Sequence, residues 1–252
     1  MRHVQRQQIC IGNAAFCDRR YSNVSLIGTH NSAFVGNFLD PRMNQEKTVT
    51  EQLDAGIRFI QAQTHMGNPR VLQLNKDGGN DNKTQKRDDA DELSMCHTNC
   101  ELLYAGNQDL RPMSEFDSIL KSTGLHSLAY IPPTSPSQIP MNQWPTYGNL
   151  ISDNKRLIIS MDSMTDDSKV PYILSEFIHF FETPYGNKDP KFAQATIPHP
   201  EQNLQTNAAT GEGSIGAQAD LCMQEWDRPP NVVLVDMFDR GDVFTAQKNL
   251  NE

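Results

Sequence analysis

Seven polar side chains in this sequence follow directly on short apolar runs, at points where strands of an α/β fold would end. They are His30, Gln61, Gln63, His65, His97, Asp162 and Asp236. In parallel α/β folds, functional residues lie beyond the carboxyl ends of the strands, where those ends meet at one edge. A single histidine is more often a structural hydrogen-bonding residue. Several polar side chains at the carboxyl ends of neighbouring strands, however, indicate a functional site.

Two histidines and an aspartate suit the cleavage of a phosphodiester. A neutral imidazole can take the proton from the attacking hydroxyl, while a second, protonated imidazole gives one to the leaving oxygen. A carboxylate beside the first imidazole fixes its tautomer and stabilises its charged form. Histidine can fill both roles near neutral pH because its unperturbed pKa is about 6.5.

The elements expected to carry these residues alternate between strand and helix. Apolar runs predict strands at 23–28, 57–63, 93–96, 156–161 and 231–236, with a weaker sixth at 70–74. Helices are predicted at 48–56, 114–121, 170–182, 214–226 and 241–250. The first helix carries a capping box, Thr48 with Glu51, and a terminating Gly56. Uniformly apolar strands that alternate with helices favour a parallel sheet covered by helices.

Composition narrows the class of protein. The chain has 252 residues, which suits one (β/α)8 barrel, and its net charge is -9. An acidic chain is a poor general nucleic-acid binder, because neutralising phosphates requires clustered Lys and Arg. No apolar run approaches the length of a membrane span. The opening "MRHVQRQQICIG" lacks the apolar core of a signal peptide.

We expect residues 1–9 to be disordered and the polar stretch 75–92 to be a solvated loop.

The cysteines form two close pairs and one leftover. They are Cys10, Cys17, Cys96, Cys100 and Cys222. This spacing favours two local disulfides, Cys10 with Cys17 and Cys96 with Cys100, in an exported protein. Two alternatives stay open: a reduced intracellular chain, and a zinc site built on Cys96, His97 and Cys100. The second would need a further ligand pair, which the sequence does not supply in the usual spacing.

Several blocks together resemble the secreted fungal PLC-like phosphodiesterases, which belong with the X domain of phosphatidylinositol-specific phospholipase C. The blocks are "CIGNAAFCDRRYSNVSLIGTHNSAFVG", "VTEQLDAGIRFIQAQTH", "CHTNCELLYAG" and "TNAATGEGSIGAQADLCMQEWDRPPNVVLVDMFDRGDVFTAQ". The resemblance implies a TIM-barrel-like (β/α)8 fold, a single domain over 1–252, secretion, and cleavage of a phosphodiester. It matches His30 to the general base and His97 to the general acid. Asp236, by its strand position, is the candidate partner of His30.

The sequence departs from this family at the second strand. Calcium-dependent relatives carry carboxylates where this chain has Gln61 and Gln63, and two neutral amides are poor ligands for Ca2+. We therefore expect no metal and no cofactor. Metal-independent bacterial relatives use an arginine on that strand, which is also missing. We assign Asn31, Gln61, Gln63 and Asp162 to substrate binding.

Two stretches of the family pattern are shortened, after "LLYAG" and before "TNAATGEGSIG", whereas 75–92 looks inserted. We therefore expect the protein to fold as an incomplete barrel and to be a monomer. Its expected substrate is a small phosphodiester or a lipid head group. The alternative is a catalytically inactive relative that binds a head group or a sugar phosphate. Retained His30 and His97 favour the enzyme, whereas neutral Gln61 and Gln63 favour the binding protein.

Overall fold

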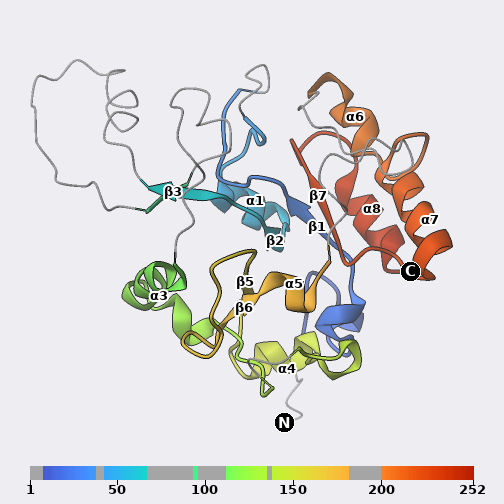
Figure 1. Cartoon of the computed structure of the whole chain (residues 1–252). Coiled ribbons are helices and arrows are strands. Elements are labelled where there is room, and N and C mark those ends of the chain that lie inside the picture. Colours follow the sequence, from blue (N-terminus) through green and yellow to red (C-terminus); the bar gives the residue numbers. More distant parts are fainter. Residues whose placement is uncertain (1–7, 38–42, 67–92, 96–111, 135–137, 182–199) are drawn as a thin grey trace, which may run out of the picture.

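The centre of the molecule is a three-stranded parallel sheet. The structure is a computed structural model that describes residues 8–37, 43–66, 93–95, 112–134, 138–181 and 200–252 (Figure 1). Strand β1 (Leu26–Thr29) lies between β2 (Phe59–Ile60) and β7 (Val232–Val235). Its partners are parallel, with Gly28 opposite Phe59 and Thr29 opposite Val235. All four residues of β1 are buried, as the uniformly apolar strand predicted.

Two helices close one face of this sheet. Helices α7 (Ile215–Trp226) and α8 (Val243–Leu250) lie side by side next to β7 (Figure 1). Ile27 and Val235 from the sheet pack there with Ile215, Val243 and Ala246. Both helices match the predicted segments. Ser214 caps α7 through its side chain, whereas Asp242 at the start of α8 makes no side-chain cap.

Helix α1 (Val49–Ala55) forms as the sequence predicted. The Thr48–Glu51 capping box is complete, and Gly56 ends the helix with a left-handed φ of 115°. Only glycine adopts such an angle without steric cost. The short α1 connects β1 to β2 and sets the direction in which the chain enters β2.

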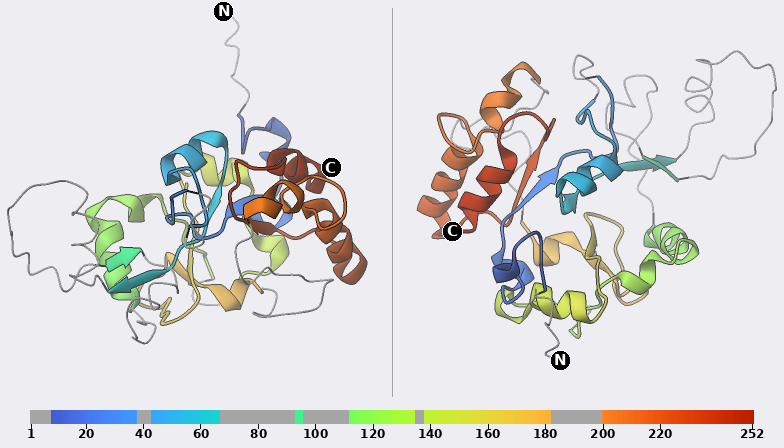
Figure 2. Two further views of the ribbon diagram at one scale, coloured as in Figure 1. Left: turned by 90° about the horizontal axis from the view of Figure 1, so that it is seen from above. Right: turned by 180° about the vertical axis from the view of Figure 1, so that it is seen from behind.

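A second region holds β5 (Ile159–Met161) and β6 (Ile173–Ser175), which pair in parallel. Around it lie α3 (Met113–Ser122), α4 (Tyr147–Ser152) and α5 (Glu176–His179), and α6 (Asn203–Thr206) precedes α7. Short 3₁₀ turns occupy Ala14–Phe16, Tyr21–Asn23, Leu125–Leu128, Met141–Gln143 and Pro200–Gln202. Figure 2 shows α3 and α7 at opposite sides of the molecule in both views.

The predicted helix over 170–182 is wrong. Residues Ile173–Ser175 form strand β6, and only the four residues of α5 are helical. Ile173 and Leu174 are fully buried between neighbours, so tertiary pairing with β5 overrides the helical periodicity. The aromatic side chains of this segment do not form a buried face, since Phe177 is 61% exposed and Phe181 is 76% exposed.

The predicted strand over 57–63 is divided. It breaks after Ile60 and resumes as β3 (Thr64–Met66), which pairs antiparallel with β4 (Leu93–Met95). The sequence indicated a wholly parallel sheet. This prediction is wrong for β3 and β4, which pair antiparallel. Among the described residues the strands form one three-stranded and two two-stranded sheets, and no closed barrel.

One predicted disulfide is present, between Cys10 and Cys17. Cys10 is fully buried and packs with Val24, Leu26 and Tyr147, so the bridge ties the amino-terminal loop to β1. Cys222 is a free thiol of intermediate exposure, and partial burial raises its pKa. Cys96, Cys100, His97 and residues 70–74, 75–92 and 1–7 lie outside the described part of the chain.

Stability should depend on the sheet–helix core. We expect Ile27→Ala to lower the free energy of unfolding by about 2–5 kcal/mol, because it opens a cavity at a fully buried site. Leu204→Ala, at a side chain that is 66% exposed, should change it by less than about 0.5 kcal/mol. Chemical denaturation measured by circular dichroism compares the two, and equal losses would contradict this description of the core.

Candidate functional site

The pairing of β1 with β7 brings His30 and Asp236 together. Each residue directly follows its strand, and the backbone N–H of His30 donates to the Val235 carbonyl at 3.0 Å. His30 Nδ1 lies 2.9 Å from Asp236 Oδ1. The two side chains are 37% and 22% exposed, so a substrate can reach the imidazole while the carboxylate is partly shielded. The predicted partnership of these two residues is thus present in the geometry.

The residue after each member of the pair has an unusual backbone. Asn31 and Met237 both have φ of 46°, in the left-handed region. Asparagine tolerates this conformation, whereas for methionine it costs free energy that the surrounding contacts must offset. The two bends turn the chain sharply at the carboxyl edge of the sheet, so that His30 and Asp236 face each other.

Gln45 ties the two bends together. Its Nε2 donates to the carbonyls of His30 and Val235, each at 2.9 Å, and its Oε1 accepts from the Phe238 N–H at 3.3 Å. The side chain is fully buried. Sequence reasoning missed Gln45 because it lies between predicted elements and carries no chemistry of its own. The only signal was the pair of adjacent amides, Asn44 and Gln45, before the charged Glu46 and Lys47.

Gln61 holds the loop after β1. Its Oε1 accepts from the Asn31 N–H at 2.8 Å, and its backbone carbonyl accepts from the Ser32 N–H at 2.8 Å. Beneath it, Thr29 Oγ1 donates to Gln52 Oε1 at 2.7 Å, and Gln52 Nε2 donates to the Ser32 carbonyl at 2.8 Å. The sequence analysis assigned Gln61 to substrate binding, but in the structure its Oε1 supports the loop after β1.

The side chain of Asn31 lies against His30. Its Nδ2 is 3.0 Å from His30 Nε2, and the residue is fully buried. Its Oδ1 is also buried and has no hydrogen-bond partner among the described residues. A buried acceptor without a partner carries a free-energy cost, which a ligand hydroxyl could remove.

The remaining predicted residues are placed differently. Asp162 follows β5 as expected, but it is exposed and accepts from the neighbouring Ser163 hydroxyl at 3.0 Å. Gln63 lies in the segment between β2 and β3 and is half-buried. His65 is within β3, and His97 lies outside the described residues. The structure thus joins His30, Asn31, Gln61 and Asp236 in one site.

The donor set does not suit Ca2+. Asp236 is the one carboxylate in direct contact with His30 among the described residues, and its Oδ1 already accepts from His30 and Asn44. The amide oxygen of Gln61 is engaged by a backbone N–H. Ca2+ takes six to eight oxygens, several of them anionic. No group of three or more His, Cys, Asp or Glu residues within the described chain could hold a metal ion.

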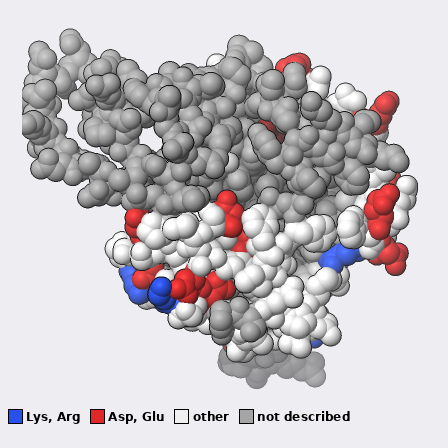
Figure 3. Space-filling model, viewed as in Figure 1, with Lys and Arg blue, Asp and Glu red and all other residues white. Residues whose placement is uncertain are grey.

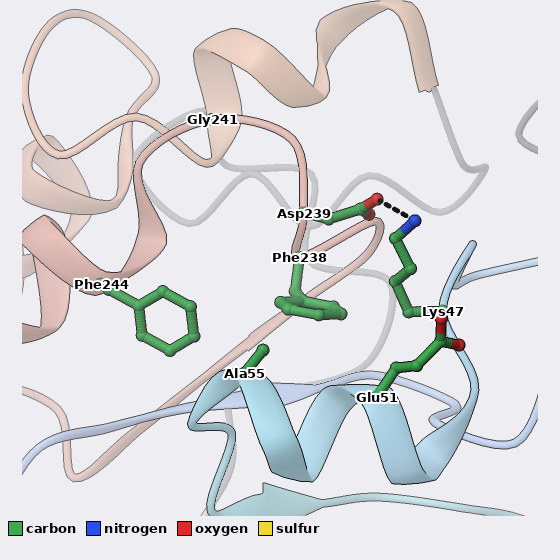
Figure 4. Close-up of a pocket in the computed structure, with 7 residues that line it drawn as sticks. All are labelled: Lys47, Glu51, Ala55, Phe238, Asp239, Gly241 and Phe244. Atoms are coloured by element: carbon green, nitrogen blue, oxygen red, sulfur yellow. Dashed lines mark ion pairs between the residues drawn. The ribbon is translucent and has the colours of Figure 1, made fainter. Parts of the chain in front are cut away.

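A separate cavity lies between α1 and the loop after β7. It has a volume of about 390 Å³ and is open to solvent, with Phe238, Phe244 and Ala55 as its apolar floor (Figure 4). Lys47 and Asp239 approach to 3.9 Å at its edge. Neither His30 nor Asp236 lines it, so the chemistry is placed by the hydrogen-bonded pair and not by this cavity.

The described surface on the face seen in Figure 3 is mostly uncharged. Figure 3 shows scattered acidic side chains and few basic ones on this face, in line with the net charge of -9. None of the described helices is long and apolar enough to cross a membrane.

A histidine–aspartate pair at the carboxyl edge of a parallel sheet is the arrangement of an α/β acid–base site. Comparison with known proteins identifies the family: the family model "PI-PLC X 1" matches residues 16–205 and 195–251. The chain belongs to the PI-PLC X family.

Two fungal relatives come from Arthroderma benhamiae. The chain is 35% identical to a PI-PLC X domain-containing protein 1, over 96% of this chain and 89% of that protein. It is 32% identical to an uncharacterized secreted protein, over 96% of this chain and 64% of that protein, which is less than two thirds of its length. No solved structure matches. The first alignment spans 298 residues against a chain of 252, so it contains gaps opposite residues of the relative.

Gln45 should be essential to the site's geometry. Gln45→Leu leaves two buried carbonyls and one N–H without this partner, so we expect the free energy of unfolding to fall by about 2–4 kcal/mol. Gln143→Leu, at an exposed glutamine, is the matched control and should change it by less than about 0.5 kcal/mol. Urea unfolding monitored by tryptophan fluorescence gives both values. A neutral Gln45→Leu would contradict this role.

Proposed function

We propose that this protein is a phosphoric diester hydrolase of the phospholipase C type. The observation that supports this most directly is the hydrogen-bonded His30–Asp236 pair at the carboxyl edge of the sheet in a PI-PLC X family chain. A carboxylate on Nδ1 leaves Nε2 as the basic nitrogen of the imidazole. His30 is then the general base.

In the proposed reaction, a substrate hydroxyl or a water gives its proton to His30 Nε2 as its oxygen attacks phosphorus. The bond from phosphorus to the leaving oxygen breaks, and His97 donates a proton to that oxygen. Asp236 stabilises the imidazolium that forms on His30. These assignments rest on family membership for His97 and on the 2.9 Å contact for Asp236.

Asn31 must respond when substrate binds. Its Nδ2 occupies the position next to His30 Nε2 that the attacking hydroxyl needs. We propose that the hydroxyl displaces this amide, which then donates to a phosphate oxygen, while Asn31 Oδ1 accepts a hydrogen bond from the substrate. The buried, unpartnered Oδ1 supports this part of the proposal. Gln63 and Asp162 would contact substrate groups farther from phosphorus.

We propose a small phosphodiester or a lipid head group as substrate, a secreted location and a monomeric state. The relative named as a secreted protein and the Cys10–Cys17 disulfide support secretion, because disulfides persist in oxidising compartments. The mechanism is proposed to be metal-free, since the Gln61 amide oxygen is already engaged by a backbone N–H and an amide supplies no anionic oxygen for Ca2+.

The competing function is that of a catalytically inactive relative that binds a head group. Two observations favour it: Gln61 is neutral and engaged in holding the loop, and the sheets described do not close a barrel. The two functions differ in turnover, and both require the same residues at the sheet edge.

Turnover should depend on both histidines. In assays of water-soluble phosphate ester released from phosphatidylinositol and other phosphodiesters, we expect His30→Ala and His97→Ala each to lower kcat/KM by about 10²–10⁴. Asp236→Asn should lower it as well, whereas Asp153→Asn, at an exposed carboxylate, should not. A folded wild-type protein with no turnover on any substrate would contradict the enzyme and leave the binding function.

Metal removal should leave activity unchanged. Treatment with EDTA, followed by addition of Ca2+, should alter kcat/KM by less than about twofold, because Gln61 and Gln63 supply no anionic oxygen. Activity lost with EDTA and restored by Ca2+ would overturn the metal-free mechanism while retaining the phosphodiesterase.

A further inference from the structure

We propose that Asn44 is a positioning residue for the general base. Together with Asn31 it forms a second hydrogen-bonded path from Asp236 to the far nitrogen of the His30 ring. This path and the direct contact hold His30 as the neutral tautomer with its proton on Nδ1 and its lone pair on Nε2. The inference deepens the proposed function and rests on it for the catalytic role of His30.

Asn44 is fixed beside the site by its backbone and by burial. Its carbonyl accepts from the Met237 N–H at 2.7 Å, directly after Asp236 in the chain. Only 1% of the residue is exposed. Its Nδ2 lies 2.9 Å from Asp236 Oδ1, and its Oδ1 lies 3.3 Å from Asn31 Nδ2. The path continues from Asn31 Nδ2 to His30 Nε2 at 3.0 Å.

The direction of each hydrogen bond along this path follows from the charge on Asp236; the longer approach of Asn44 Nδ2 to His30 Nδ1, at 3.4 Å, is not part of the path. An ionised carboxylate only accepts, so Asn44 must turn its NH₂ group toward it. The oxygen of Asn44 then faces Asn31 and must accept from the Asn31 NH₂ group. That same NH₂ group faces His30 Nε2, which must also accept. The amide orientations are therefore set by the network, starting from one anionic group.

The alternatives each place like groups in contact. Turning Asn44 over would bring its carbonyl oxygen within 2.9 Å of the carboxylate oxygen. Turning Asn31 over would bring two amide oxygens within 3.3 Å of each other. A proton on His30 Nε2 would face the Asn31 NH₂ group at 3.0 Å. Each of these leaves buried donors or acceptors unpaired, at a cost of about 1–3 kcal/mol per group.

The chemical consequence is a base that is ready before substrate arrives. A histidine held by its carboxylate alone keeps Nδ1 protonated, but nothing then acts on Nε2. Here the amide path presents a donor to Nε2 and so favours a ring that keeps its lone pair on that nitrogen. The attacking hydroxyl is itself a donor toward Nε2, and it can take the place of the Asn31 amide without any change of tautomer.

The test is the ring ¹⁵N spectrum of His30 in the intact protein, labelled at its seven histidines. Long-range ¹H–¹⁵N correlation distinguishes a protonated ring nitrogen from one with a lone pair, and His30→Ala assigns the signal. We expect wild type to show the neutral Nδ1–H tautomer. Asn44→Leu should increase the share of Nε2–H and doubly protonated forms and lower kcat about tenfold, with KM nearly unchanged. Asn149→Leu, at an exposed asparagine, is the matched control.

Asn31→Ala gives an independent check, because it removes the last link of the path while Asp236 keeps its Asn44 donor. It should shift the tautomer in the same direction. A wild-type signal dominated by Nε2–H, or an unchanged tautomer in both variants, would overturn the inference. If the tautomer shifts as expected while wild type turns over no phosphodiester, the amide path stands and the proposed function fails.

Discussion

The parallel pairing of β1 with β7 is the constraint on which the site depends. The two strands are about 200 residues apart in the chain, yet Thr29 lies opposite Val235, so the next residues are His30 and Asp236. A register shift of one residue would turn one of these side chains to the other face of the sheet. The buried contacts of Ile27 and Val235 with α7 and α8 hold this register. Packing on one side of the sheet thus positions the His30–Asp236 pair at its edge.

The site is built mostly from neutral amides around one partly exposed histidine–aspartate pair. Gln45, Gln61, Asn31 and Asn44 hold the backbone bends and the side chains of His30 and Asp236. Amides can both donate and accept, so they transmit orientation from one group to the next without adding charge. Such a network positions a base well, but it offers little positive charge for a phosphate. In the proposed reaction that stabilisation comes from amide and backbone N–H donors and from His97.

Two observations bear on the proposed shortening of this chain relative to its family. Its alignment with a fungal relative extends over more residues than it contains, and the described strands form three separate small sheets. The amino-terminal disulfide and the buried cluster around Tyr147 secure β1. The edge of the sheet that carries His30 and Asp236 is therefore well supported even though the described strands do not close a barrel.

The sequence by itself determined the local elements and the family. The capping box of α1, the strand before Asp236 and the helices over 214–226 and 241–250 follow from side-chain types at close spacing, which act within a few residues. The sequence blocks around His30 and Asp236 were sufficient to indicate the family. Tertiary structure decided the break after Ile60, the strand at Ile173–Ser175 and the roles of Asn44 and Gln45. These depend on partners distant in the chain, and a buried amide reveals its function only when the groups that it joins are known.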